Sequence, residues 1–147
     1  MKILFVCSGN TCRSPMAQAL FSKISAEKNL GAECESAGLS TFTGSPASEN
    51  SVTALKEVGI DISNFRSTSI TAIIPRLKDF DLFVPMTYAH AMALLQLGVE
   101  KKKIYLFDTD VSDPYGGDLS VYRDTRDELS KKLDTFAEFV QNINNKR

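Results

Sequence analysis

Cys7 and Arg13 lie six positions apart in the run C-S-G-N-T-C-R-S-P, which ends at Pro15. An ionised thiol is a strong nucleophile, and a guanidinium is a planar fork that matches two oxygens of a phosphate group. The apolar run Ile3–Val6 before this segment predicts a buried strand, and Ser14-Pro15 are typical of the start of a helix. The segment therefore predicts an anion cradle with a nucleophile at its base, suited to phosphate esters or related compounds.

The backbone N–H groups of residues 8–13 can point inward as a nest for an anion, and the following helix adds the positive end of its dipole. Gly9 lets the backbone approach the anion without a Cβ atom, and Asn10 tolerates a left-handed conformation. These donors and Arg13 favour the thiolate of Cys7 and can hold the charge that develops in a transition state.

Two assignments in this segment stay open. Ser14 can cap the helix or donate a hydrogen bond to the sulfur of Cys7, and one hydroxyl cannot do both. Cys7, taken alone, also fits a buried structural cysteine at a strand end; the strand before it, Arg13 and the Ser-Pro pair favour the catalytic interpretation.

A leaving group needs a proton, and Asp113-Pro114 follows an apolar run near the C-terminus. An Asp at that place can act as a general acid. The alternative is a plain turn, because Asp-Pro followed by Gly116-Gly117 is ordinary turn chemistry. The pairing with Cys7 favours the acid. Nearby rivals are Asp108, Asp110 and Asp118, the last of which fits a helix cap.

The composition is that of an ordinary globular protein, with 147 residues, 43% hydrophobic and 24% charged, and a net charge of −1. We expect one domain, residues 1–147. The charge gives no field that attracts nucleic acid or a membrane surface. No 18-residue apolar stretch and no secretory signal are visible, so we expect a cytoplasmic protein.

The chain has three cysteines, Cys7, Cys12 and Cys34, and one histidine. An odd number of cysteines in a reducing compartment argues against a disulfide framework. Without a C-x-x-C pair and with a single histidine, we expect no zinc site.

Apolar patterns typical of strands and helices alternate along the chain. The sequence predicts strands at Ile3–Val6, from near Ala32 to Gly38, at Asp81–Val84 and at Ile104–Phe107. Helices are expected after Ser14-Pro15, after Ser45-Pro46 up to Gly59, after Thr87 up to Gly98, and over a last stripe made of Tyr122, Leu129, Leu133, Phe136, Val140 and Ile143. Residues 60–77 are ambiguous, and Pro75 interrupts any long helix there.

This alternation predicts an α/β fold with a doubly wound, four-stranded parallel sheet and helices on both faces. Ligands bind such sheets outside the carboxyl ends of the strands, at a topological switch point. The Cys7 segment follows the carboxyl end of the first predicted strand, so the fold places it where a site is expected.

The sequence resembles the low-molecular-weight protein tyrosine phosphatase family. The resemblance covers the whole chain and rests on C-x5-R-S-P, Ser36-Ala37-Gly38, Gly59–Ser63 and Asp113-Pro114-Tyr115. It implies that Cys7 attacks phosphorus to form a phosphocysteine and that Arg13 binds the phosphate. Asp113 then protonates the leaving atom and acts as base for the hydrolytic water.

The resemblance further implies that Asn10 and Ser36 brace the loop and that Ser14 tunes the thiol. Phosphorylated proteins are the implied partners, without metal or organic cofactor, and the expected state is a monomer or weak dimer. The residues expected to contact substrate are Ser8, Gly9, Asn10, Thr11, Cys12, Ser14 and Tyr115.

Thr11 stands where tyrosine-specific members usually carry an aliphatic residue such as Ile. It resembles the bacterial protein-arginine phosphatase branch, as do Asp113–Gly117, Tyr122–Leu129, and Met86-Thr87 with His90. A β-branched hydroxyl can narrow the pocket mouth and favour a phosphoramidate over an aryl ester. We therefore expect phosphoarginine to be preferred, with phosphotyrosine as the alternative, since Thr and Ile can also pack the same wall without consequence.

Other positions carry narrower expectations. Phe65 replaces a histidine that braces the Asn in many members, so Asn10 must depend on Ser36 or Asn64. Cys12 can form a reversible disulfide with Cys7 or simply pack the loop. His90 is expected to cap or pack its helix without a catalytic part.

Two other function classes share parts of this pattern. An arsenate reductase on this scaffold relays oxidation through cysteines late in the chain, and this chain has none after Cys34. A non-catalytic phosphate-binding module would need neither the Cys7 thiol nor the Asp113 carboxyl.

Overall fold

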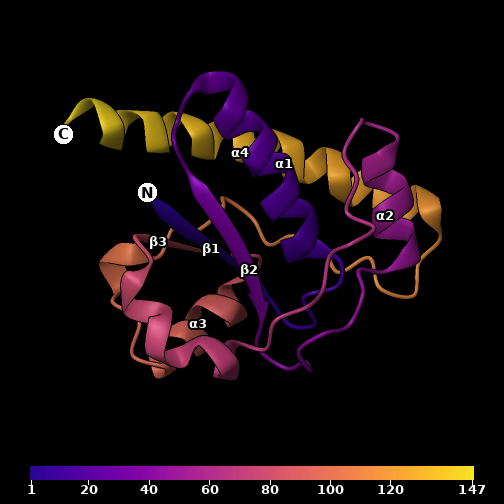
Figure 1. Cartoon of the computed structure of the whole chain (residues 1–147), viewed down its shortest axis with the longest axis horizontal. Coiled ribbons are helices and arrows are strands. Elements are labelled where there is room, and N and C mark those ends of the chain that lie inside the picture. The colour runs from indigo at the N-terminus through magenta and orange to yellow at the C-terminus, as the bar shows by residue number, and fades with distance from the viewer.

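The computed structural model describes all 147 residues and contains a three-stranded parallel sheet (Figure 1). Its strands are β1 (Lys2–Cys7), β2 (Glu33–Gly38) and β3 (Leu82–Pro85), in the order β2-β1-β3. The central strand, β1, is buried from Ile3 to Cys7, and it pairs Cys7 with Gly38 on one side and Val6 with Pro85 on the other. The expectation of a parallel α/β sheet is confirmed.

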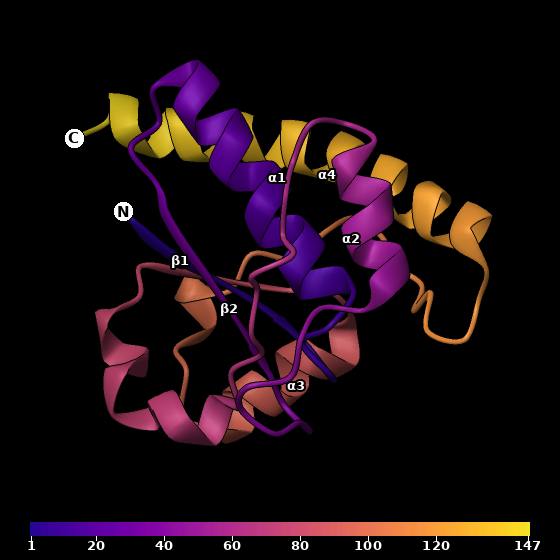
Figure 2. The same ribbon diagram turned by 45° about the vertical axis from the view of Figure 1, so that its right-hand side comes forward.

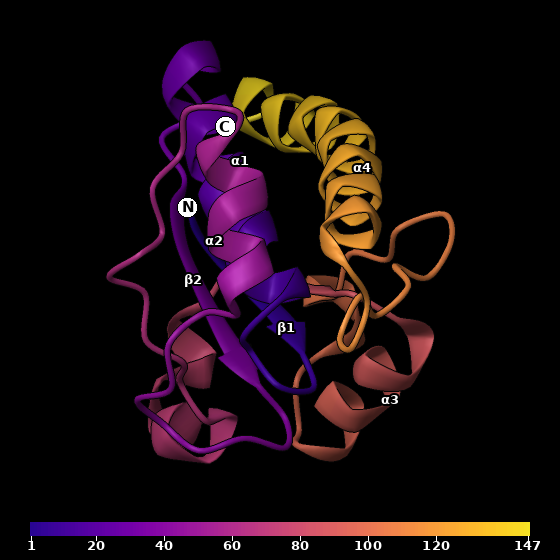
Figure 3. The same ribbon diagram turned by 90° about the vertical axis from the view of Figure 1, so that its right-hand side faces the viewer.

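Helices cover both faces of the sheet, as Figures 2 and 3 show. One face carries α1 (Arg13–Lys28), α2 (Glu49–Lys56) and α4 (Leu119–Asn145). The other carries the 3-10 helix η1 (Ile70–Asp79) and α3 (Tyr88–Gln96), and a short 3-10 turn, η2 (Lys101–Lys103), follows. The ambiguous stretch before β3 thus ends in 3-10 turns that contain Pro75.

The two-residue period of β1 builds two separate cores. Ile3 and Phe5 point to the cluster under α1, α2 and α4, whereas Leu4 and Val6 point to the cluster under η1 and α3. All four are fully buried, as expected for a central strand of a parallel sheet. The predicted stripe of α4 lies against the first of these cores.

The predicted fourth strand is wrong. Ile104 forms only an isolated parallel bridge to Phe83, and no strand forms over residues 104–107. The side chains still alternate, because Ile104 packs on the second core while Tyr105 and Phe107 pack on the first. Tyr105 lies 4.6 Å, centroid to centroid, from Phe136 of α4. The apolar run therefore serves packing against α4 rather than a continued ladder of hydrogen bonds.

The predicted helix start at Ser45-Pro46 is also wrong. Pro46 pairs with Arg66 in an isolated antiparallel bridge, and α2 begins three residues later with Ser48 as its N-cap. The Ser48 side chain accepts a hydrogen bond from Ser51 N. Thr87 and Asp118 cap α3 and α4 in the same way, as the sequence predicts.

The topology directs a ligand to the end of β1. From β1 the chain crosses to β2 on one side and later to β3 on the other, so the switch point lies at the carboxyl end of β1. The Cys7 segment forms the connection from that end into α1. No helix combines the length and the apolar character that a membrane crossing requires.

Candidate active site

The loop from β1 to α1 surrounds a cavity of about 250 Å³. Nine of the ten residues expected at the site line it, together with Ser40, which the sequence did not indicate. The lining residues are Cys7, Ser8, Gly9, Asn10, Thr11, Cys12, Arg13, Ser40, Asp113 and Tyr115. The tenth, Ser14, is fully buried beneath the cavity and contacts Cys7. Segments about 100 positions apart in the sequence thus meet at one place, as the pairing of Cys7 with Asp113 predicts.

The sulfur of Cys7 lies at the base of this cavity and has two polar neighbours. Ser14 Oγ lies 2.9 Å from Cys7 Sγ, and Asn10 N donates to the same sulfur over 3.2 Å. Asn10 Nδ2 in turn donates to Ser14 Oγ over 2.7 Å. Because Ser14 Oγ accepts from Asn10, its own proton is available for a hydrogen bond to the sulfur.

The two competing assignments for Ser14 are resolved by where α1 begins. The helix starts at Arg13 with Cys12 as its N-cap, and no side chain caps it. Ser14 is therefore already inside the helix, and its hydroxyl is turned to Cys7.

Asn10 braces the loop through every polar atom of its side chain. Its φ of 53° is left-handed, as the sequence predicts for this Asn. Besides Ser14, its Nδ2 donates to Ser36 Oγ at 3.0 Å, and its Oδ1 accepts from Thr68 N at 2.8 Å. Ser36 Oγ donates onward to Gln18 Oε1 at 2.6 Å. Of the two substitutes for the missing histidine at position 65, Ser36 is thus the one that contacts Asn10.

Arg13 is held at the cavity by the segment that carries Asp113. Its Nη1 donates to Val111 O at 3.0 Å, and its Nη2 lies 3.6 Å from Asp113 Oδ2. The Arg13 side chain is 7% exposed, whereas that of Asp113 is 53% exposed. A buried guanidinium is thereby fixed beside a carboxyl that a substrate can reach.

Asp113 both forms a turn and faces the cavity, so the two interpretations of Asp113-Pro114 are compatible. Its Oδ1 accepts from Tyr115 N at 3.1 Å, and Gly117 N donates to Pro114 O at 2.9 Å. The rival carboxylates are engaged elsewhere. Asp108 pairs with Lys132, Asp110 accepts from Tyr88 N, and Asp118 caps α4.

The cavity rim combines an aromatic ring with a buried thiol. Tyr115 is 80% exposed, consistent with a place at the mouth. Cys12 is buried and lies 3.4 Å from both Ser48 Oγ and Tyr122 OH. Burial raises the pKa of Tyr122 to about 12, so its hydroxyl stays protonated. All three cysteines are free thiols, and the disulfide between Cys7 and Cys12 stays a prediction.

His90 reaches the loop from α3. Its Nε2 lies 2.9 Å from Ser8 Oγ across 82 positions of sequence, and its side chain is buried. The sequence indicated only that His90 caps or packs its helix, and this contact to the loop was missed.

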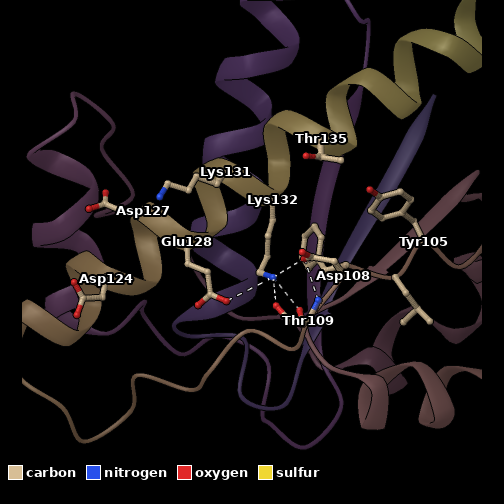
Figure 4. Close-up of a pocket in the computed structure, with 11 residues that line it drawn as sticks. Tyr105, Asp108, Thr109, Asp124, Asp127, Glu128, Lys131, Lys132 and Thr135 are labelled. Atoms are coloured by element: carbon tan, nitrogen blue, oxygen red, sulfur yellow. Dashed lines mark hydrogen bonds and ion pairs between the residues drawn. The ribbon is translucent and has the colours of Figure 1, made fainter.

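A larger hollow of about 710 Å³ lies between α4 and residues 105–109 (Figure 4). Its wall holds no thiol. Lys132 points into it and is engaged by Asp108 Oδ1 at 2.9 Å, by Glu128 at 3.7 Å and by Thr109. Because Lys132 is paired and no thiol faces the larger hollow, the smaller cavity at Cys7 is the one equipped for chemistry.

The site combines the Cys7 thiol at the end of the central parallel strand with the fixed guanidinium of Arg13 and the accessible carboxyl of Asp113. This combination is that of a cysteine-dependent phosphatase. The sequence agrees with this class over nearly its full length. Residues 2–147 match the family model "Low molecular weight phosphotyrosine protein phosphatase", and the chain belongs to that family of protein phosphatases.

Similar proteins carry three different activities in their names. A protein-arginine-phosphatase of Bacillus subtilis is 37% identical, over 93% of this chain and 95% of its own. An arsenate reductase of Halalkalibacterium halodurans is 35% identical, over 92% and 94%. The crystal structure of a low molecular weight protein tyrosine phosphatase from T. tengcongensis is 41% identical, with a TM-score of 0.87, over 94% and 98%. Overall identity therefore does not select the substrate.

Proposed function

We propose that this protein hydrolyses phosphoarginine in proteins. The Cys7 thiolate attacks phosphorus, the P–N bond breaks, and Asp113 gives its proton to the departing guanidine nitrogen. Asp113 then takes a proton from water as the water attacks the phosphocysteine, which releases phosphate and restores the thiolate. Arg13 and the amides of residues 8–13 hold the phosphoryl oxygens in both steps.

The observation that carries the preference is Thr11 in the cavity wall. It lines the cavity together with Asp113 and Tyr115, and it is half-buried. A hydroxyl there offers a polar wall, which suits a planar, hydrogen-bonding guanidinium better than an apolar aryl ring. Tyr115, at the rim, offers a ring face for the same cation.

The relative named as an arsenate reductase suggests a second activity, which the cysteines of this chain disfavour. That chemistry needs further thiols to relay oxidation, and the only cysteine besides Cys7 and Cys12 is Cys34 in β2. Burial raises the pKa of Cys34 to about 11, so its thiolate is scarce at neutral pH. No cysteine follows it in the chain.

The test compares kcat/KM for a phosphoarginine peptide and for the matching phosphotyrosine peptide. We expect the wild type to prefer phosphoarginine, and Thr11→Ile to shift the ratio towards phosphotyrosine by roughly 10-fold or more. Thr11→Val is the matched control, because it keeps the shape and removes only the hydroxyl. If Val shifts the ratio as Ile does, the hydroxyl is responsible; if only Ile does, the size of the side chain is. A wild type that prefers phosphotyrosine contradicts the proposal.

A further inference from the structure

His90 enters the site as a buried group with a single partner. His90 is 6% exposed, and its Nε2 lies 2.9 Å from Ser8 Oγ. Its other ring nitrogen, Nδ1, is buried without any hydrogen-bond partner. Ser8 is exposed at the cavity, and its hydroxyl has no protein partner other than His90. The positions of the protons on His90 and Ser8 therefore decide whether the Ser8 hydroxyl can donate a hydrogen bond to a ligand.

The imidazole is held neutral by its surroundings. His90 occupies the third position of α3, close to the positive end of the helix dipole, where a positively charged imidazolium is disfavoured. Burial, and next the charge of Arg13, lower the pKa of His90 from 6.5 to about 4, while Asp110 and Asp113 oppose the shift. At neutral pH the ring thus carries one proton and one lone pair.

The orphaned Nδ1 indicates which nitrogen holds the proton. A proton on Nδ1 would leave a buried N–H without an acceptor, which native structures rarely tolerate, whereas an unpaired acceptor is less unusual. A proton on Nε2 instead makes His90 the donor to Ser8 Oγ. The Ser8 hydroxyl then accepts from His90, and its own proton is free to point into the cavity.

We propose that His90 is a positioning residue that donates from Nε2 to Ser8 and so turns the Ser8 hydroxyl proton towards the phosphoryl oxygens bound in the loop. The inference rests on the proposed phosphoryl transfer at Cys7. It adds a side-chain donor to the backbone amides of residues 8–13 that the proposed function assigns to the phosphoryl oxygens. A donor aimed at an anion is about twice as strong as one to a neutral group, and the contact strengthens as charge develops on the oxygens.

The first test reads the protons of the ring directly. His90 is the only histidine, so its imidazole nitrogens give the only such signals in a ¹⁵N spectrum of the wild-type protein. We expect the neutral form with Nε2 protonated between pH 6 and 8, both without ligand and with saturating inorganic phosphate. An Nδ1-protonated ring or an imidazolium in that range overturns the proposal, whether or not the protein is an active phosphatase.

The second test is a double-mutant cycle on hydrolysis of para-nitrophenyl phosphate and on the affinity for inorganic phosphate. Loss of one donor to a charged group costs roughly 10- to 100-fold. We expect Ser8→Ala and His90→Leu each to lower kcat by about this factor, and the double variant to be no worse than either. Effects that multiply would mean that His90 acts without Ser8, and they contradict the proposal.

Two variants separate positioning from folding. His90→Gln can place an amide N–H where Nε2 lies, so we expect it to recover most of the kcat lost in His90→Leu. Met92→Leu alters a partly exposed site on the same helix and should leave kcat unchanged. A His90→Gln enzyme as slow as His90→Leu refutes the donor. A wild type without any turnover refutes the proposed function instead, and the spectrum and phosphate affinity still decide the part played by His90.

Discussion

At the scale of single residues, one chain of hydrogen bonds leads through Asn10 and Ser14 to the sulfur of Cys7. Thr68 N donates to Asn10 Oδ1, Asn10 Nδ2 donates to Ser14 Oγ, and the remaining proton of Ser14 is directed to Cys7. Each group uses its acceptor on one neighbour and its donor on the next, so no proton of the set competes with the thiolate. The loop is thereby ordered before any substrate arrives.

Replacing the nucleophile should abolish turnover but leave phosphate binding intact. We expect Cys7→Ser to lose at least about 10⁴-fold in kcat, because a serine hydroxyl in this setting has no base to activate it. The variant should still bind inorganic phosphate, since Arg13 and the loop amides remain. Cys34→Ser is the control, a half-buried position in β2 outside the cavity, and should stay near the wild-type rate. Residual activity near wild type in Cys7→Ser would show that the nucleophile is elsewhere.

The role of Asp113 as general acid is tested with a series of substrates whose leaving groups differ in basicity. Asp113→Asn should slow substrates with poor leaving groups by roughly 10² to 10⁴-fold, and those with good leaving groups far less, since a good leaving group departs without a proton. The measurement is a plot of log kcat against leaving-group basicity, which should become steeper in the variant. Asp110→Asn is the matched control, because Asp110 holds Tyr88 N and does not line the cavity. Equal slowing across the series points to another acid.

At the scale of elements, the end of β2 fits closely under the loop. A Cβ atom on Gly38 would lie 2.6 Å from Thr41 Cγ2, 2.8 Å from Ser8 O and 3.0 Å from Asn10 Cβ. Leu39 N and Ser40 N also donate to Cys7 O and Ser8 O. The absence of a side chain at Gly38 is therefore what lets the second strand support the catalytic loop.

Gly38→Ala should damage the site more than the fold. We expect a loss of more than about 10-fold in kcat with a loss of roughly 1 to 3 kcal/mol in the free energy of unfolding, because the backbone of Ser8 must move. Adding Thr41→Ala should not restore activity, since Ser8 O and Asn10 Cβ still block the methyl group. Gly98→Ala, where φ is +93° and space is open, should cost stability alone. Normal turnover in Gly38→Ala contradicts this account.

Local sequence patterns predict the positions of helices and strands better than they predict which segments pair through their backbones. The side chains of the run Ile104–Phe107 alternate as in a strand and pack on both cores. The backbone of the run nevertheless forms only one bridge, from Ile104 to Phe83. Ser14-Pro15 lies in the first turn of α1, one residue after its start at Arg13, whereas at Ser45-Pro46 no helix begins and Pro46 pairs with Arg66 instead. Periodicity reports which way side chains point, and it does not report which backbone they pair with.

The candidate site shows the same division. Cys7, Arg13 and Asp113 were predicted because their chemistry is visible in residue type and spacing. Gln18 and Thr68 were missed because their parts depend on contacts across the fold: one lies outside the loop on α1, and the other contributes only a backbone N–H. A backbone donor has no signal in the residue type.

At the scale of the whole molecule, the site is assembled from segments that both cores hold in place. The loop follows β1, Ser36 comes from β2 and His90 from α3. The segment before Asp113 is tied to α4 by the ion pair between Lys132 and Asp108 (Figure 4). The Lys132 side chain is 8% exposed and also donates to Thr109 O at 3.1 Å. Loosening either face of the sheet thus alters the geometry at Cys7.

His90 also couples the stability of the whole molecule to pH. Its pKa is about 4 in the folded protein and 6.5 as the ordinary value, so the unfolded chain binds more protons between these limits. The free energy of unfolding should therefore fall as the pH drops from about 6.5 to about 4. One pKa unit corresponds to about 1.4 kcal/mol, so the full loss is about 3 kcal/mol.

Urea unfolding at pH 7, 6 and 5 measures this, with His90→Gln as the matched variant. Most of the decline should vanish in His90→Gln, because Gln does not titrate. Glu57, Asp61, Asp108 and Asp118, whose pKa values are lowered by hydrogen bonds, begin to lose their contribution only below about pH 4.5 and do not obscure the comparison. Parallel curves for the two proteins would mean that His90 is accessible to protons in the folded state, and that the buried imidazole does not set the acid limit of the fold.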